Sequence, residues 1–293
     1  MGSIGSVTQD KTLTDSPAYR THPYKAFEVT VADHVAEVTL IGPSKGNAQG
    51  PDFWAESAPL FEAIDADPDV RAVVLSGSGK HFSFGLDLPA MMGDFGKVLA
   101  PDAKAGPRTE FHHTIKRMQR AIDAVADCRK PVVAAISGWC IGGAVDLISA
   151  ADIRVASADA KFSVREVKVA IVADMGSLAR LPLIIGEGHT RELALTGKDI
   201  DAARAEKIGL VSDVYDDKDA TLAAARGIAA EIAANAPLVV QGVKDVLDHS
   251  RSARVDDSLR YVAAWNAAFL PSDDLTEAVT AVFEKRPPNF RGQ

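Results

Sequence analysis

The sequence is poor in cysteine and in positive charge, and it has no long uninterrupted apolar stretch. Its two cysteines, Cys128 and Cys140, do not have the spacing of a metal site. We therefore expect two reduced core cysteines and a cytoplasmic protein. No apolar run reaches the roughly 20 residues that cross a bilayer, and no signal-peptide pattern opens the chain. These two features predict a protein without a membrane partner.

Basic residues are outnumbered by acidic ones. The 293-residue chain has 32 Lys and Arg against 40 Asp and Glu, a formal net charge of -8. Such a protein has no overall positive field to attract phosphates, which argues against nucleic acid as a partner. Hydrophobic residues (47%) and charged residues (25%) are present in the proportions of a soluble globular protein with a substantial core.

The hydrophobic pattern divides the chain into three parts. Residues 1–24 are polar and aperiodic, which predicts a flexible N-terminal tail. Residues 25–215 mix strand-like and helix-like segments and predict an α/β core, beginning with a hairpin over 27–40 that turns at Asp33-His34. Residues 216–293 contain helical patterns alone, typical of a helical region that packs on the core or on a neighbouring subunit.

Individual elements follow from local periodicity. Long helices are expected at 52–66 and 110–128, and residues 91–108 are expected to be irregular. Shorter elements are expected as a strand at 70–75, a helix or turns at 175–185, helices at 190–195 and 202–208, and a strand at 211–215. The C-terminal helices are expected at 220–235, 238–249, 255–269 and 274–285.

Two stretches, 70–88 and 131–147, share a pattern of buried strand, Ser-Gly turn, glycine-containing segment and Asp-Leu pair. Glycines at a strand-to-helix turn let a ligand approach the backbone and leave helix N-terminal N–H groups without partners. Together the two corners can form a pocket with two donors for a developing oxyanion. The alternative is a pair of similar corners with no shared ligand.

Two nucleotide motifs and a metal site are excluded on inspection. The run at 76–80 fails as a phosphate loop, because Val74 stands where its first glycine belongs and His81 follows its lysine. The dinucleotide fingerprint fails at its third glycine. His81, His112 and His113 have no acidic or cysteine partner at ligand spacing, so we expect no metal site.

Three carboxylates, Asp146, Glu166 and Asp174, stand in apolar runs. Burial of a carboxylate is costly unless the group is paired or used. Two carboxylates in one apolar pocket divide into a charged and a neutral group, which is the state that an acid/base shuttle requires. Helix capping is the alternative for Asp146 and for Asp174, which precedes Met175-Gly176-Ser177.

These residues lead to a family resemblance. Residues 130–138, the glycine pair 142–143 and residues 151–154 resemble the signature of the crotonase (enoyl-CoA hydratase/isomerase) superfamily, and residues 81–88 resemble its acyl-CoA loop. The likeness extends from about Phe27 to Phe290. It implies an α/β, crotonase-like (ClpP/crotonase) spiral of ββα units with a helical C-terminal trimerisation region, assembled as a homotrimer or as a dimer of trimers, a hexamer.

Within the superfamily the sequence is most similar to Δ3,5-Δ2,4-dienoyl-CoA isomerases, chiefly because Asp174 falls where hydratases usually have glycine. The resemblance implies an isomerase of fatty acid β-oxidation that shifts 3,5-dienoyl-CoA to 2,4-dienoyl-CoA. In this scheme Glu166 is the base beside the carbonyl, Asp174 the acid at the far end of the diene, and Asp146 orients the pair. The backbone N–H groups of Leu86 and Gly143 form the oxyanion hole.

The resemblance also implies substrate contacts, and no cofactor, since coenzyme A is part of the substrate. The implied binding residues are Lys45, Ser83, Phe84, Gly85, Asp87, Gly142, Lys285 and Phe290. Lys45 and Lys285, together with Arg286 and Arg291, are candidates for holding the CoA phosphates. The alternative is that these four residues form a solvated basic face. Phe283 and Phe290 are candidates for contacts between subunits, and Met91, Met92 and Trp139 belong either to the acyl tunnel or to the core.

One departure from the family pattern bears on the chemistry. Lys168 stands where an acidic residue is common, and a cation beside Glu166 would lower the pKa of that base. We expect Lys168 to face solvent. Three other functions remain open: an enoyl-CoA hydratase, a non-catalytic crotonase-fold binding or scaffold protein, and an acyl-CoA hydrolase or decarboxylase. The acidic balance and the three retained carboxylates argue against a scaffold.

Overall fold

The computed structural model describes residues 17–96, 104–269 and 272–288. Its main sheet has the strand order β1-β2-β3-β4-β6-β9 and its second sheet the order β5-β7-β8. The main strands are β1 (Phe27–Ala32), β2 (Val35–Leu40), β3 (Ala72–Gly77), β4 (Val132–Ile136), β6 (Ile153–Ser157) and β9 (Asp213–Tyr215). The second sheet contains β5 (Trp139–Ile141), β7 (Lys161–Ser163) and β8 (Ile200–Asp201). Apart from the antiparallel pairs β1/β2 and β7/β8, the paired strands run parallel.

The predicted N-terminal hairpin is confirmed. Ala32 pairs with Val35, which leaves Asp33 and His34 as a two-residue turn. Both turn residues have positive φ, 47° and 67°. A two-residue turn with positive φ at both positions matches the right-handed twist of the flanking strands.

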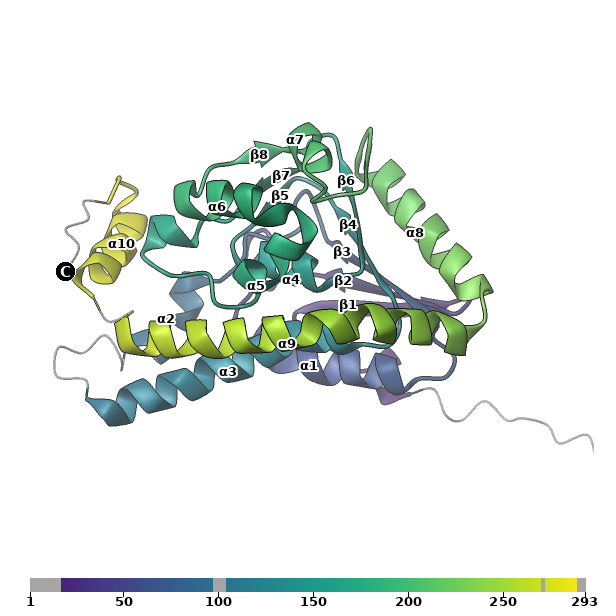
Figure 1. The fold of residues 1–293 in the computed structure, drawn as a ribbon, viewed down its shortest axis with the longest axis horizontal. Coiled ribbons are helices and arrows are strands. Elements are labelled where there is room, and N and C mark those ends of the chain that lie inside the picture. The colour runs from purple at the N-terminus through teal and green to yellow at the C-terminus, as the bar shows by residue number, and fades with distance from the viewer. Residues whose placement is uncertain (1–16, 97–103, 270–271, 289–293) are drawn as a thin grey trace, which may run out of the picture.

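The central parallel strands β3 and β4 are buried on both faces, which explains their continuous apolar runs. Along β3, Val73 and Leu75 belong to the main core, whereas Ala72 and Val74 belong to a second cluster. Helix α8 (Lys218–Ala234) covers the second cluster with its alanine-rich face. Helices α1 (Pro51–Ala66), α3 (Ala105–Asp127) and α4 (Gly143–Ala150) contribute to the main core, and Figure 1 shows α1 and α3 on the side of the sheet away from α8.

The remaining helices lie mainly in the second half of the chain. They are α2 (Leu88–Gly96), α5 (Ser177–Ile184), α6 (Gly186–Thr196), α7 (Ala202–Lys207), α9 (Pro237–Phe269), α10 (Asp273–Glu284) and the 3-10 turns η1 (Ala18–Arg20) and η2 (Glu166–Val169). Helix α9 runs beside α3 across the molecule, and α10 lies at one end of the molecule (Figure 1).

Two element predictions are wrong. The segment 91–108, expected to be irregular, is helical at 91–96 in α2 and at 105–108 in α3, and its residues 97–103 lie outside the described residues. Helix α2 forms because Asp87 accepts a hydrogen bond from the Ala90 backbone N–H and because Met91 and Phe95 bury one face. The two helices expected at 238–249 and 255–269 are the single helix α9. The residues between them, 250–254, include neither Gly nor Pro, so no local signal ends the helix.

Residues 17–24, expected to belong to a flexible tail, are held against the core. Tyr19 is buried, and its hydroxyl donates a 2.7 Å hydrogen bond to Asp67. Arg20 pairs with the same carboxylate at 2.6 Å. These contacts attach residues 17–24 to the core, while residues 1–16 of the predicted tail lie outside the described residues. The boundary between core and C-terminal region at 215/216 stays a prediction.

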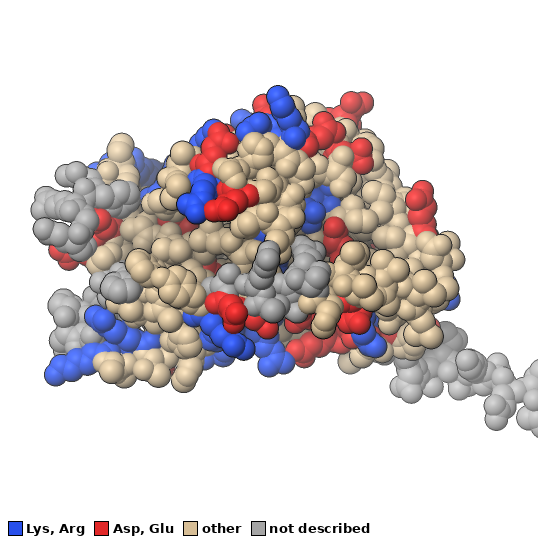
Figure 2. All heavy atoms as spheres, in the orientation of Figure 1, with Lys and Arg blue, Asp and Glu red and all other residues tan. Residues whose placement is uncertain are grey.

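The surface carries mixed charge. Figure 2 shows acidic and basic side chains interspersed on the face of Figure 1. Within the described residues, no single helix is long and apolar enough to cross a membrane; one pair, Lys218–Ala234 with Pro237–His249, meets the length and composition criteria only together and is bent by 109°.

Candidate active site

The two glycine-containing corners that share a sequence pattern lie against each other. The backbone N–H of Phe82 donates to the carbonyl of Ser137 at 2.8 Å, and that of Ile141 donates to Ser83 at 3.2 Å. Gly85 makes this approach possible: its φ is +73°, and a Cβ there would lie 2.4 Å from the Ile141 carbonyl oxygen. The close contact of the corners therefore requires glycine at this position.

The corners bring two unpaired backbone donors together. Gly143 is the first residue of α4, so its N–H has no acceptor within the helix. Neither this N–H nor that of Leu86 has an acceptor among the residues described. A Cβ built on Gly143 would lie 3.6 Å from the Leu86 nitrogen, which places the two donors side by side. This is the arrangement that stabilises a developing oxyanion.

An apolar cavity extends from the donors. Its volume of about 160 Å³ is about ten times the roughly 10–15 Å³ that a cavity needs to hold one water. Nearly all of its wall is hydrophobic, and Arg165 is the one basic residue among the described residues that line it. The apolar and aromatic lining residues are Trp54, Phe84, Leu86, Leu88, Phe95, Phe111, Ile115, Met118, Ile141, Val169, Ile171 and Met175.

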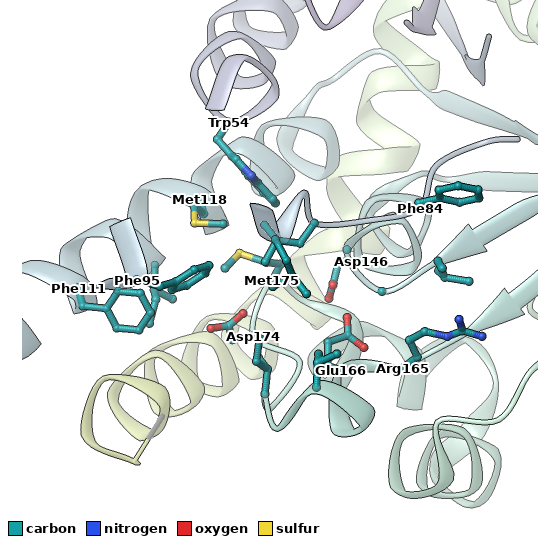
Figure 3. A pocket seen from close by; sticks show the side chains of 18 residues that line it. Trp54, Phe84, Phe95, Phe111, Met118, Asp146, Arg165, Glu166, Asp174 and Met175 are labelled. Atoms are coloured by element: carbon teal, nitrogen blue, oxygen red, sulfur yellow. The ribbon is translucent and has the colours of Figure 1, made fainter. Parts of the chain in front are cut away.

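All three candidate carboxyl groups line this cavity. Asp146 comes from α4, Glu166 from η2, and Asp174 from the segment that precedes α5. Figure 3 shows the side chains of Asp146 and Glu166 pointing toward one another, with Asp174 farther along the cavity near Met175. The Oε2 atom of Glu166 is buried and has no hydrogen-bond partner among the described residues. An unpaired carboxylate oxygen in an apolar cavity is free to accept a proton.

Burial raises the pKa of each member of this trio. Burial and the neighbouring charge of Asp146 hold the pKa of Glu166 well above its ordinary value. Burial raises the pKa of Asp174 to about 7, against the opposing effect of a hydrogen bond from Asn266. Burial also raises the pKa of Asp146, opposed by the Ser177 backbone N–H. A cavity with three such groups holds protons at pH values where exposed carboxylates are ionised.

The capping alternative applies to Asp146 rather than to Asp174. Helix α5 has Gly176 as its N-cap residue, and the Ser177 backbone N–H donates to Asp146 Oδ1 at 2.5 Å. Asp174 instead accepts a 2.6 Å hydrogen bond from the Asn266 side chain. Asp146 therefore faces the cavity while it satisfies an orphan donor of a neighbouring helix.

The predicted substrate-binding residues divide into two groups. Phe84 and Gly142 line the cavity, and a Cβ on Gly142 would lie 3.5 Å from Glu166 Oε1. Ser83 and Asp87 use their side chains within the loop. The Ser83 hydroxyl donates to the Asn47 carbonyl oxygen and accepts from the Gly85 N–H, and Asp87 accepts from Ser44 and Ala90.

The described candidates for the CoA phosphates, Lys45, Lys285 and Arg286, do not line the cavity. Lys45 is exposed in the loop before α1, and Lys285 is exposed at the C-cap of α10. Phe290 and Arg291 lie outside the described residues, and Arg286 is paired with Glu277 and Glu284. Of the residues left open between tunnel and core, Met91 is buried in the core.

Lys168 faces solvent, as expected, and His81 makes a contact between the two corners. Lys168 is exposed, so the cation does not face Glu166. The His81 Nδ1 atom accepts a 3.2 Å hydrogen bond from the Trp139 backbone N–H. Burial, together with the charge of Lys80, lowers the pKa of His81. This histidine joins the two corners of the site.

Sequence reasoning missed Asn266 and Gln119. Asn266 lies on α9 and continues the buried face formed by Leu259, Val262 and Ala263. A polar residue on that apolar helical face was the available signal, but it did not identify the partner. Gln119 on α3 donates to the backbone carbonyls of Asp174 at 2.7 Å and Leu259 at 3.1 Å.

The chain matches the enoyl-CoA hydratase/isomerase family over residues 30–293. It belongs to this family. A Δ(3,5)-Δ(2,4)-dienoyl-CoA isomerase of Dictyostelium discoideum is 43% identical over 273 residues, with 92% of each chain covered. The peroxisomal enzyme of that name from Arabidopsis thaliana is 43% identical, covering 91% of this chain and 97% of the relative. The crystal structure of an enoyl-CoA hydratase/isomerase from Pseudoalteromonas atlantica has a TM-score of 0.78 at 28% identity, covering 91% of this chain and all of that one.

Family membership establishes the crotonase fold and corrects the expected location. The Dictyostelium relative is named as mitochondrial and the Arabidopsis relative as peroxisomal, which contradicts the prediction of a cytoplasmic protein. The prediction was wrong because the two buried, free cysteines exclude only oxidising compartments. Cysteine content does not distinguish the cytosol from the interior of an organelle.

Proposed function

We propose that this enzyme converts 3,5-dienoyl-CoA thioesters to 2,4-dienoyl-CoA thioesters by moving a proton between two buried carboxyl groups. The observation that carries this proposal is one apolar cavity lined by Asp146, Glu166 and Asp174 and bordered by two free backbone donors. The relatives named as dienoyl-CoA isomerases support the same reaction, which belongs to the β-oxidation of unsaturated chains.

The thioester oxygen lies between the N–H groups of Leu86 and Gly143. Removal of a proton beside the carbonyl places negative charge on this oxygen and along the diene, and the two donors stabilise it. Loss of one such donor typically costs about 10²–10³ in rate. Because both donors belong to the main chain, the identity of the Leu86 side chain has little influence on this step.

Glu166 accepts the proton from the carbon beside the carbonyl, through the Oε2 that has no hydrogen-bond partner. The electron pair of the broken C–H bond moves through the conjugated system, and both double bonds shift by one position toward the carbonyl. Asp174 then donates a proton to the far end of the diene. The reaction leaves Glu166 protonated and Asp174 charged, so the trio must transfer one proton back before the next turnover. Asp146, close enough to Glu166 to interact through hydrogen bonding and charge, orients that base.

This scheme uses only side chains and main-chain N–H groups, with CoA as part of the substrate and no separate cofactor. We assign the acyl group to the cavity beside Phe84 and Gly142. Lys45 and Lys285 remain candidates for the CoA phosphates because both side chains are exposed cations. Hydration needs two carboxylates that bind one water molecule. Asp174, a third carboxyl group in the cavity, disfavours that reaction.

The decisive experiment offers the purified protein a 3,5-dienoyl-CoA and a 2-enoyl-CoA in separate assays. We expect the conjugated-diene chromophore to appear with the first substrate and the enoyl absorbance to persist with the second. Asp174→Asn should lower diene formation by about 10²–10⁴-fold while CoA-ester binding is retained. Asp33→Asn, an exposed substitution in the hairpin turn, is the control and should keep full activity. Full activity of Asp174→Asn would remove Asp174 from the mechanism.

We also propose that the enzyme is a homotrimer or a dimer of trimers assembled through α9. The first half of this helix exposes Leu238 (83%), Val239 (65%), Val243 (56%) and Val246 (71%). These side chains repeat at helical spacing, and a contiguous apolar patch of this kind marks an interface.

Sedimentation velocity tests this assembly. Val243→Glu combined with Val246→Glu should shift the particle from a trimer or hexamer toward the monomer, because the charges oppose burial of the α9 patch. Leu195→Glu, at an apolar residue of α6 that is 72% exposed, is the matched control and should leave the particle size unchanged. A monomeric wild-type protein would contradict the proposal.

A further inference from the structure

The buried amide of Asn266 is the contact that α9 makes with the side chain of the proposed acid. Its Nδ2 donates to Asp174 Oδ2 at 2.6 Å and to the Val172 carbonyl oxygen at 2.9 Å. Asn266 is 1% exposed and does not line the cavity. In Figure 3, Asp174 lies between the cavity and the yellow-green helix α9.

The orientation of this amide follows from its partners. The Val172 carbonyl oxygen can only accept a hydrogen bond, so the Asn266 atom that faces it must be the NH₂ group. The same NH₂ group faces Asp174 Oδ2, and its two hydrogens serve the two oxygens. Exchange of the amide oxygen and nitrogen would place oxygen against oxygen at both contacts. The donor that reaches Asp174 is therefore assigned by geometry.

This donor constrains the position of the Asp174 proton. The carbonyl oxygen of a protonated carboxyl is a stronger acceptor than its hydroxyl oxygen. The 2.6 Å hydrogen bond to Oδ2 therefore favours the tautomer of protonated Asp174 that carries its hydrogen on Oδ1. Apart from the Asp174 backbone N–H, no other group among the described residues bonds to this carboxyl. Since Asp174 lines the cavity and Asn266 does not, Oδ1 is the oxygen left to face the acyl chain.

We propose that Asn266 is a positioning residue that reserves Oδ2 of Asp174 as an acceptor and so directs the acidic proton on Oδ1 into the cavity. The proposal rests on the assignment of Asp174 as the acid of the isomerisation. Asn266 stabilises the charged form of Asp174, whereas Asp146 on α4 and Glu166 on η2 face it as like charges and oppose that form. The C-terminal helix thus contributes to proton delivery.

Infrared spectroscopy tests the proposal without turnover. In protonated Asp174 the C=O stretch belongs to Oδ2, and a hydrogen bond lowers its frequency. The band is assigned as the one that disappears in Asp174→Asn. In Asn266→Leu we expect this band at higher frequency and its titration midpoint raised by about one to two pH units. With dienoyl-CoA we expect a lower kcat and a nearly unchanged KM.

Gln119→Met is the matched control. Gln119 is as buried as Asn266 and also ties α9 to Asp174, but it bonds the backbone carbonyls and not the carboxyl. Its substitution should leave both the infrared band and its midpoint unchanged. Asn266→Ala, a smaller change that also removes the donor, is measured in the same way in case the leucine variant does not fold.

Two outcomes would overturn the role of Asn266. One is a band and midpoint unmoved in the Asn266 variants; the other is an equal shift in Gln119→Met, which would indicate general loosening of α9. The infrared reading is independent of the diene assay. If the proposed isomerase activity is wrong, the diene assay will show it. The infrared band of Asp174 will still show whether Asn266 determines the position of the Asp174 proton.

Discussion

At the scale of single residues, the site depends on carboxyl groups held where water does not stabilise their charge. Asp146 is 1% exposed and Asp174 is 9% exposed, while Glu166 is partly exposed as a residue but buries Oε2. Burial raises the pKa of all three groups, and each has a different neighbour that limits or adds to the shift. The same residue types therefore differ in readiness to accept or donate a proton.

The pH dependence of turnover should reflect these raised pKa values. The productive state requires a charged Glu166 and a protonated Asp174, so a fully protonated and a fully ionised trio are both inactive. We expect a bell-shaped profile whose two limbs belong to the coupled trio rather than to single residues. Activity should be low near pH 5, although free carboxylates with pKa values of about 4 are already ionised there.

This profile is measured as kcat/KM of the free enzyme across the pH range at constant ionic strength. A thioester substrate has no ionisable group near the reacting carbons, so the limbs report the enzyme. A rate that stays constant from neutral pH down to about pH 5 would show that the catalytic carboxyl groups titrate as exposed ones do.

At the level of residues, the chain itself indicated the chemistry but not the geometry. Asp146, Glu166 and Asp174 were recognisable because carboxylates in apolar runs are costly. Their mutual orientation was not recognisable, since Asp146 bonds to a helix 31 residues away and Asp174 to one 92 residues away. Ser83 and Asp87 were chosen from the loop motif, and the fold uses their side chains to shape that loop.

At the scale of elements, two strand-to-helix corners must approach within backbone contact. Gly85 and Gly143 permit this approach: a Cβ on Gly143 would lie 2.3 Å from the Gln49 side-chain oxygen. The backbone of Gln49 also bonds to both neighbours of Leu86, since its N–H donates to Gly85 at 2.7 Å and its carbonyl accepts from Asp87 at 3.1 Å. The Leu86 donor is thus held by main-chain contacts on both sides.

We expect Gly85→Ala to separate the corners, because the added Cβ would lie 2.4 Å from the Ile141 carbonyl oxygen and 2.8 Å from the Gly143 nitrogen. The control is Gly79→Ala, where φ is also positive (+62°) but no atom lies within 4 Å. Both variants carry the backbone strain of a positive φ, about 1 kcal/mol. Only Gly85→Ala should also lose turnover, by about 10²-fold or more as donors are displaced.

Thermal unfolding and diene formation are measured for both glycine variants. Equal loss of stability and activity in the two would mean that backbone strain alone explains the effect. The expected result is a modest loss of stability in Gly79→Ala with turnover near that of the wild type, against a larger loss of both properties in Gly85→Ala.

Element predictions succeeded where local periodicity decides the structure. The hairpin at 27–40 and the long helix around 110–128 were found because alternation and helical spacing are strong there. Helix α2 was missed because its glycines and proline resemble loop punctuation, whereas burial of Met91 and Phe95 stabilises it. The continuity of α9 was missed because a polar stretch inside a helix resembles a boundary.

At the scale of the whole molecule, the catalytic acid should reduce stability at neutral pH. The pKa of Asp174 is raised from 3.8 to about 7 in the folded state. Folding therefore favours the protonated form of Asp174. Its contribution to the free energy of unfolding is fully present below about pH 4 and is lost as the pH rises through about 7. Above that pH the folded protein holds a buried charge.

Asp174→Asn should consequently be more stable than the wild type at about pH 8, by roughly 1–4 kcal/mol, and similar to it near pH 4. Asparagine does not titrate and still presents an oxygen to Asn266. Urea unfolding at the two pH values measures the difference. A stability difference that is the same at both pH values would show that the substitution acts through packing rather than through the buried charge.

The sequence by itself determined the family, the N-terminal hairpin and the identity of the three carboxylates, because these depend on motifs and on periodicities of a few residues. Only the tertiary structure decided that Phe95 and Met118 share a cavity wall, that Asp146 also caps α5, and that Asn266 holds Asp174. Such contacts join residues that are distant in the chain. They arise from how whole helices pack together, which no local pattern of side chains encodes.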